Sequence, residues 1–334
     1  MFPALGAVVA TLIATACPAT ALPQHVFAPY YFSQSDTLAE VSQASGAKFI
    51  TMAFLQTPAP GSCTVFWNGS TDAPVAPATY GAGIAAVRAA GGDVIPSFGG
   101  SAADTSGTEI ADSCQDVRAI AAEYERVITT YNVKRLDFDI EEDSLSDPAN
   151  LPGIDRRNKA IKLVEDWADR HHRTVQFVYT LPTNVSGLDP AGLHLLQNAI
   201  ENHARVDLVN IMTFDYFDDQ SNACAAGQGP AHQMAADTMT AGRHLFDTLR
   251  GLYPRQSASR LWRMIGITED IGRDDFGPCE TFTTADASAV ERWAAQKGLG
   301  EVSFWNLQRD RAARSHVDQT DWQFSQIFGA LTRP

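Results

Sequence analysis

The segment Leu136-Asp137-Phe138-Asp139-Ile140-Glu141 alternates apolar and acidic residues. Side chains alternate between the two faces of a β-strand, so the three acids share one face and the three apolar residues share the other. The apolar face suits a layer of covering helices, which leaves the acidic face for the inside of a barrel. Carboxyls this close cannot all ionise cheaply, so at least one pKa must rise, as a general acid near neutral pH requires. A solvated strand edge or a metal-binding carboxylate cluster are the alternatives.

Outward from this segment, strand-like and helix-like patterns alternate along the chain. Eight such β/α units predict the α/β class and a single (β/α)8 TIM barrel. No Gly-rich dinucleotide-binding loop follows the first strand. The short stretch between the last two strands leaves no room for an inserted α+β subdomain. The expected strands are His25–Phe32, Lys48–Gln56, Asp93–Phe98, Arg135–Glu141, Thr174–Leu181, Val206–Tyr216, Arg263–Thr268 and Glu301–Gln308.

The composition describes a folding chain that is acidic overall. Of 334 residues, 19% are charged and 45% hydrophobic, and the formal net charge is −14. The charge argues against nucleic acid or an anionic membrane surface as a partner. We expect a monomer with no membrane-spanning segment.

Residues 1–21 have the pattern of a secretory signal peptide, with an apolar run followed by Ala19-Thr20-Ala21. We therefore expect a secreted, extracellular protein with one domain over residues 22–334. Lipidation of Cys17 is an alternative. Asn68 and Asn184 begin glycosylation sequons.

Four cysteines remain after residue 21, which allows three disulfide connectivities. Cys63 and Cys114 fall in neighbouring loops at the carboxyl ends of the expected strands, and so do Cys224 and Cys279. The crossed pairings would have to span the barrel mouth, so we predict Cys63–Cys114 and Cys224–Cys279. No C-x-x-C or H-E-x-x-H motif is present, and we expect no metal site.

Four motifs together resemble glycoside hydrolase family 18. Asp137-Phe-Asp139-Ile-Glu141 is similar to the D-x-D-x-E core of its signature, and Ser97-Phe-Gly-Gly100 to its S-x-G-G motif. Met212-Thr-Phe214-Asp215 is similar to its M-x-Y-D region, and Trp305 stands where the family has the aromatic floor of the sugar site. The resemblance is closest to compact secreted bacterial-type chitinases.

The resemblance implies a retaining, substrate-assisted hydrolysis of chitin or another N-acetylglucosamine-containing glycan, endo-acting and without a cofactor. Glu141 would donate the proton, and Asp139 would stabilise the oxazolinium that the substrate's own acetamido group forms. Asp137 and Ser97 would tune Asp139. The implied substrate-binding residues are Ser97, Met212, Asp215 and Trp305.

Two positions depart from the family pattern. Lys134 replaces the first Asp of the signature, and Phe214 replaces a Tyr whose hydroxyl helps to hold the acetamido group. Tyr216 or Tyr179 could supply that hydroxyl, and Tyr30 should line the site. An endo-β-N-acetylglucosaminidase acting on N-glycans has a similar signature and remains an alternative. Because Phe214 departs from the pattern, a chitin-binding lectin on the same fold remains another.

Exposed aromatic residues in two loops could add sugar subsites or simply pack those loops. They are Phe66 and Trp67 after the second strand, and Tyr216 and Phe217 after the sixth.

Overall fold

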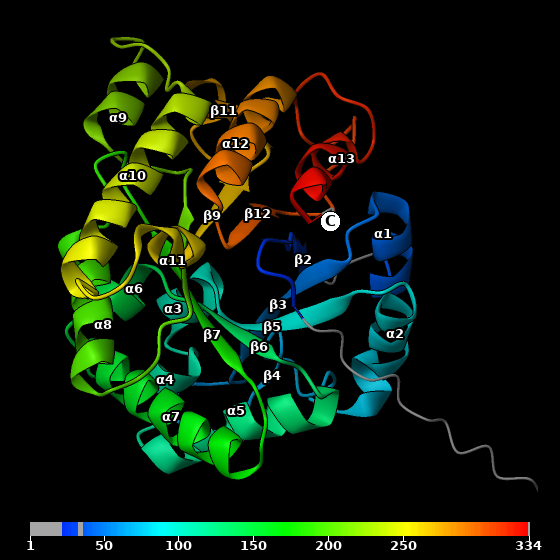
Figure 1. Ribbon diagram of the computed structural model, residues 1–334, viewed down its shortest axis with the longest axis vertical. Coiled ribbons are helices and arrows are strands. Elements are labelled where there is room, and N and C mark those ends of the chain that lie inside the picture. Colours follow the sequence, from blue (N-terminus) through cyan, green and yellow to red (C-terminus); the bar gives the residue numbers. More distant parts are fainter. Residues whose placement is uncertain (1–21, 33–35, 333–334) are drawn as a thin grey trace, which may run out of the picture.

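The computed structural model describes residues 22–32 and 36–332, and it is a closed barrel of parallel strands surrounded by helices (Figure 1). The first predicted strand forms two short pieces, β1 (Val26–Phe27) and β2 (Tyr30–Phe32). β1 pairs with β12 and β2 pairs with β3, so this segment closes the barrel. The other barrel strands are β3 (Phe49–Gln56), β5 (Asp93–Gly99), β6 (Arg135–Asp139), β7 (Gln176–Pro182), β8 (Leu208–Met212), β9 (Ile265–Asp270) and β12 (Glu301–Trp305).

Each of the eight expected strands is present, and the predicted (β/α)8 barrel is confirmed. Short antiparallel pieces, β4 (Phe66–Trp67) on β3 and the hairpin β10 (Gly272–Arg273) with β11 (Thr281–Phe282), lie outside the barrel order. Between β9 and β12 the chain forms only this hairpin, a 3-10 turn (Gly277–Cys279) and α12. The expected lack of an inserted α+β subdomain therefore agrees with the described residues.

The helices present apolar stripes to the outside of the barrel. In α5 the buried residues include Ile120, Tyr124 and Val127, which follow the helical period. Asp189 caps α8 and Pro190 follows it at the first helical position. The longer helices are α1 (Leu38–Ser45), α2 (Pro77–Ala89), α5 (Val117–Tyr131), α7 (Leu151–Arg170), α8 (Pro190–Glu201), α10 (Met234–Leu252) and α12 (Thr284–Lys297). Shorter ones are α3 (Ser101–Ser106), α4 (Ile110–Ser113), α6 (Glu142–Ser146), α9 (Asp219–Ala225), α11 (Ala258–Arg263) and α13 (Gln323–Phe328).

Two strands end earlier than predicted where the acidic residues are, and β12 also ends early, at Trp305 rather than Gln308. β6 ends at Asp139, so Glu141 lies just beyond it, at the residue that precedes α6. β8 ends at Met212 rather than Tyr216. Asp215 has a φ of 45°, which takes the chain out of the strand conformation.

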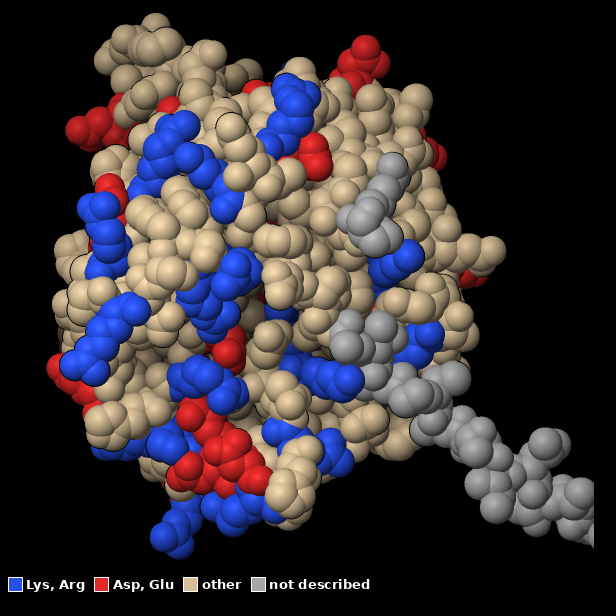
Figure 2. All heavy atoms as spheres, in the orientation of Figure 1, with Lys and Arg blue, Asp and Glu red and all other residues tan. Residues whose placement is uncertain are grey.

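Much of the acidic excess lies inside the molecule. Among the described residues, thirteen Asp and Glu side chains are buried, against two Arg. On the face shown in Figure 2, Lys and Arg are dispersed among uncharged residues, and Asp and Glu gather near the lower edge. The net charge is therefore a poor guide to the charge of the surface.

Both predicted disulfides are present. Cys63–Cys114 joins the loop after β3 to the end of α4, with a Cα–Cα distance of 4.8 Å. Cys224–Cys279 joins α9 to the loop after β10, at 5.8 Å. The predicted signal peptide and Cys17 lie outside the described residues. Within the described residues, no helix is both long and apolar enough to cross a membrane.

Candidate active site

The barrel interior is polar and built in layers along β6. At the amino ends of the strands, Arg135 forms a buried ion pair with Glu301 at 2.5 Å. Asp137, two residues further along β6, accepts hydrogen bonds from Ser97 (2.5 Å), Thr180 (2.7 Å) and Tyr30 (3.0 Å). The apolar residues between the acids lie in the main hydrophobic core, so the predicted alternation of β6 is confirmed.

Asp137 is therefore a buried carboxyl with three donors around it. Burial raises the pKa of Asp137 to about 6, against the opposing effect of the hydrogen bonds from Ser97, Thr180 and Tyr30. Tyr30 is only 2% exposed, and its hydroxyl is committed to Asp137 and Thr180. Tyr30 thus lies beneath the acidic row, where its hydroxyl supports Asp137 and its ring packs beside Trp305.

Asp139 is the next carboxyl along the row, and it has fewer hydrogen-bond partners than Asp137. Its side chain is 4% exposed, and its Oδ1 has no hydrogen-bond partner among the described residues. Burial raises the pKa of Asp139 well above its ordinary value, and the nearby carboxyls of Glu141, Asp137 and Asp104 raise it further. The charged form of Asp139 is therefore disfavoured unless another group takes up its proton or supplies a positive charge.

Glu141 completes the row at the carboxyl end of the barrel and is partly exposed. Burial raises the pKa of Glu141 to about 7, and the charges of Glu142 and Asp215 act in the same direction. A backbone hydrogen bond from Ser101, the first residue of α3, opposes them. A carboxyl that is half protonated near neutral pH can act as a general acid and then as a general base.

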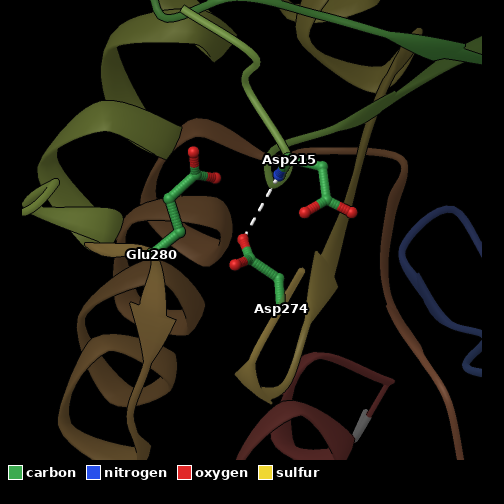
Figure 3. Close-up of side chains that lie close together, drawn as sticks. All are labelled: Asp215, Asp274 and Glu280. Carbon is green, nitrogen blue, oxygen red and sulfur yellow. Dashed lines mark hydrogen bonds between the residues drawn. The ribbon is translucent and has the colours of Figure 1, made fainter. Parts of the chain in front are cut away.

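Asp215 is held at the mouth by a clamp from the β10–β11 hairpin (Figure 3). Asp274 accepts the backbone N–H of Asp215 at 3.3 Å, and the backbone N–H of Asp275 donates to the Asp215 carboxylate at 3.1 Å. Burial and the charge of Asp275 raise the pKa of Asp215 to about 7. The turn that follows β8 is thus fixed by side chains from a neighbouring loop.

The acidic trio Asp215, Asp274 and Glu280 has the donor atoms that a metal ion would need. One oxygen of each lies within 4.8 Å of the others (Figure 3). These carboxyls already accept protein donors, since Glu280 accepts the N–H of Tyr216 and the hydroxyl of Ser221. The hydrogen bonds of these carboxyls therefore stabilise the turn at Asp215.

Aromatic rings form a second wall of the site, as a small cluster separate from the main core. Trp305, at the end of β12, is partly exposed and stacks on Phe54 with ring centroids 5.7 Å apart. Tyr30 and Phe32 lie within 5.9 Å and 5.7 Å of the Trp305 ring. Trp305 thus has the exposed, supported ring that a sugar-stacking residue needs.

Two of the predicted substrate-binding residues do not lie at the row. Tyr179 has the outward parity of β7, and its hydroxyl donates to Asn158 of α7 at 2.7 Å. Tyr216 is 3% exposed in the main core, with its ring 5.0 Å from that of His232. Tyr179 lies on the outer face of β7, which faces the helices. Because β8 ends at Met212, the chain turns before Tyr216 and places this side chain away from the barrel interior. Neither replaces the hydroxyl that Phe214 lacks.

The remaining sequence candidates divide between mouth and core. Met212 ends β8 and is 7% exposed, two residues beyond Asn210, which donates to Thr180 on the neighbouring strand β7. Trp67 is buried and donates to the Tyr131 hydroxyl, so it is a core residue. Phe217 is 67% exposed and meets Phe276 edge to face.

Three groups at the site escaped the sequence analysis. Thr180 lies on the inner face of β7 and pairs with Asp139. The alternation of inward and outward residues along the predicted strand could have identified it. Phe54 lies near the end of a predicted strand and could have been found from that place. Asp104, in a short helix after the S-x-G-G motif, had no sequence signal.

Comparison with known proteins agrees with this geometry. The model of the glycosyl hydrolases family 18 matches residues 26–245, which is more than half of the chain. The chain is 30% identical over 329 residues to a "Probable bifunctional chitinase/lysozyme" of Escherichia coli, covering 95% of this chain and 35% of that protein. It is 30% identical over 300 residues to "Endochitinase 11" of Metarhizium anisopliae, covering 89% of this chain and 54% of that protein. The chain thus spans only about a third and about half of these two relatives.

Solved structures give the same result. The catalytic domain of a hyperthermophilic chitinase from Pyrococcus furiosus superimposes with a TM-score of 0.77 at 29% identity, covering 94% of this chain and 96% of that one. A GH18 chitinase from Cycas revoluta, solved with (GlcNAc)3, shares the fold at 11% identity and a TM-score of 0.62. Fold and acidic row define a glycosidase-type barrel, and the chain belongs to glycosyl hydrolase family 18.

Proposed function

We propose that this protein is a chitinase that hydrolyses β-1,4-linked N-acetylglucosamine polymers with retention of configuration. The observation that carries the proposal is the graded acidic row of β6. Asp137 accepts three hydrogen bonds, and Asp139 is buried with no partner for its Oδ1 among the described residues. Glu141 lies at the mouth with a pKa raised to about 7.

The row favours substrate assistance over a protein nucleophile. A carboxyl must be ionised to attack a sugar carbon, and the burial of Asp139 among other acids disfavours its ionised form. The acetamido oxygen of the substrate would attack C1 instead, while Glu141 gives its proton to the departing glycosidic oxygen. The oxazolinium then carries a positive charge, which Asp139 stabilises as its own proton passes toward Asp137.

The second half of the reaction returns the site to its starting state. Water attacks C1 and breaks the bond to the acetamido oxygen, and its proton goes to the Glu141 carboxylate. As the positive charge disappears, the proton shared with Asp137 returns to Asp139. Two inversions at C1 give net retention. Trp305 would stack under the reacting sugar, and Asp215, fixed by its hairpin clamp, would orient the acetamido group or Glu141.

We also propose that the enzyme is secreted and endo-acting. Two disulfides suit an oxidising compartment, and residues 1–21 have a signal-peptide pattern. The short connection between β9 and β12 carries no inserted subdomain beside the site, which suits attack along a polymer chain. One relative is named an endochitinase.

A paired assay tests the substrate class. The purified protein is incubated with N-acetylglucosamine tetramer or hexamer and, separately, with a high-mannose glycopeptide. We expect cleavage of the oligomers only. Cleavage of the glycopeptide alone would identify an endo-β-N-acetylglucosaminidase, and oligomer binding without cleavage would identify a lectin.

The pH dependence of kcat/KM should report the ionisation of Glu141. Because Glu141 works as an acid, activity is present while its carboxyl is protonated and is lost as pH rises through about 7. The alkaline limb of kcat/KM should therefore have its midpoint near pH 7. Glu142 is the charge that raises this pKa most, so Glu142→Gln should move the limb to lower pH by roughly a few tenths of a unit.

The matched control is Glu201→Gln, the same change at an exposed residue at the end of α8. It should leave the limb in place. A limb that does not move in Glu142→Gln, or that moves equally in both variants, would show that another group controls the alkaline side.

A further inference from the structure

The backbone of Glu141 has an unusual hydrogen-bond partner. β5 and β6 pair as far as Gly99 and Asp139, and the N–H of Gly100 still donates to the carbonyl of Asp139 at 2.9 Å. The chain then turns into α3, and the carbonyl of Gly100 accepts the N–H groups of Ala103 and Asp104. That carbonyl is thus engaged within α3.

The side chain of Asp104 takes up the N–H of Glu141. Its Oδ2 accepts that N–H at 2.5 Å, and the carboxyl is fully buried. Gly99 lets the backbones of β5 and β6 approach closely here, because a Cβ at Gly99 would lie 2.0 Å from the carbonyl oxygen of Asp139. Glu142, the next residue, has a φ of 41°, so this hydrogen bond lies directly before a left-handed turn.

Residues of α3 contact both the backbone N–H and the side-chain carboxyl of Glu141. Asp104 holds the backbone N–H, and the backbone of Ser101, one helical turn earlier, hydrogen-bonds to the carboxyl. Glu141 makes no side-chain capping bond to α6, the helix that it precedes. The carbonyl of Glu141 accepts the N–H of Ser144 in α6 at 3.1 Å. α3 therefore supplies the contacts to the backbone N–H and to the carboxyl, and α6 the contact to the carbonyl.

Burial disfavours the charged form of the Asp104 carboxyl. Burial raises the pKa of Asp104 well above its ordinary value, and the charges of Glu109 and Glu141 raise it further. A neutral acid accepts the Glu141 N–H without adding a full negative charge beside Asp139. An amide side chain of the same size keeps that accepting oxygen.

We propose that Asp104 is a positioning residue that fixes the proton donor through the backbone N–H of Glu141. This inference rests on the proposed function, in which Glu141 is the acid. A general acid displaced by about 1 Å loses up to about 10²-fold in rate, even though the substrate is bound as before.

The test compares three variants with the wild type. Asp104→Ala removes the acceptor and should lower kcat by about 10- to 100-fold with KM within about threefold. Asp104→Asn keeps the acceptor and should stay within about threefold of wild-type kcat. Asp310→Ala is the matched control, since Asp310 is a fully buried carboxyl that accepts the N–H groups of Phe324 and Ser325 away from the row. It should lower thermal stability but not kcat.

Amide hydrogen exchange gives a readout that does not depend on activity. In Asp104→Ala the peptide that contains residues 139–142 should exchange at least about tenfold faster than in the wild type, and in Asp104→Asn it should not. If Asp104→Ala does not fold, Asp104→Ser carries the same expectation, because its hydroxyl is too short to reach Glu141.

The outcomes separate this inference from the proposed function. Wild-type kcat in Asp104→Ala, or an equal loss in the Asn variant, would overturn the positioning role and leave the chitinase proposal intact. A wild type that cleaves no oligomer would refute the function, while the exchange pattern would still decide whether Asp104 fixes the backbone of Glu141.

Discussion

Replacing Glu141 by Gln is expected to reduce hydrolysis of an unactivated N-acetylglucosamine oligomer by about 10²–10⁴-fold or more. The amide keeps the shape of the side chain but has no proton to give to the leaving oxygen. Trp305 and Asp215 are untouched, so oligomer binding should remain. Steady-state rates with the tetramer and calorimetric binding of the same oligomer measure the two quantities.

Glu201→Gln again serves as the control and should turn over at the wild-type rate. A Glu141→Gln variant with near-wild-type turnover would remove Glu141 from the role of acid. A variant that neither binds nor cleaves would point to a disturbed fold, which its thermal unfolding would reveal.

Replacing Asp139 by Asn should move activity and stability in opposite directions. The Asp139 carboxylate is needed when the oxazolinium forms, and losing one such preorganised partner typically costs about 10²–10³-fold in rate. In the resting protein, however, Asp139 is a buried acid whose raised pKa makes ionisation costly.

The sign of the stability effect follows from that raised pKa. Stability from a protonated Asp139 is fully present below the ordinary pKa of an aspartic acid and is lost as pH rises through the folded-state value. Asn does not titrate, so the variant escapes this loss. The melting temperature of Asp139→Asn relative to wild type should therefore increase between pH 5 and pH 8, as scanning calorimetry can measure. A difference that shrinks with pH would contradict the protonation assigned to Asp139.

The sequence predicted the fold well because the signals that it used are periodic. Inward and outward residues alternate along β6, and each strand is followed by a helix whose apolar residues repeat at the helical period. The disulfides followed from the barrel order alone, since adjacent loops on one face bring their cysteines together.

The site was harder to predict where the strands end. Tyr216 seemed to continue β8, but the left-handed Asp215 turns the chain outward. The partners that fix this turn, Asp274 and Glu280, lie about 60 residues later in a hairpin with no motif of its own. Asp104 was missed for the same reason, because it acts by a side chain-to-backbone contact that no spacing encodes.

The anomeric form of the first product tests the central claim most directly. Proton NMR is recorded within the first minutes of tetramer hydrolysis, before mutarotation, and the account predicts that the β-anomer appears first. A parallel substrate whose reacting sugar lacks the 2-acetamido group should remain intact, because the nucleophile is gone. An α-anomer as the first product, or ready cleavage of the substrate without the acetamido group, would contradict substrate-assisted hydrolysis by this barrel.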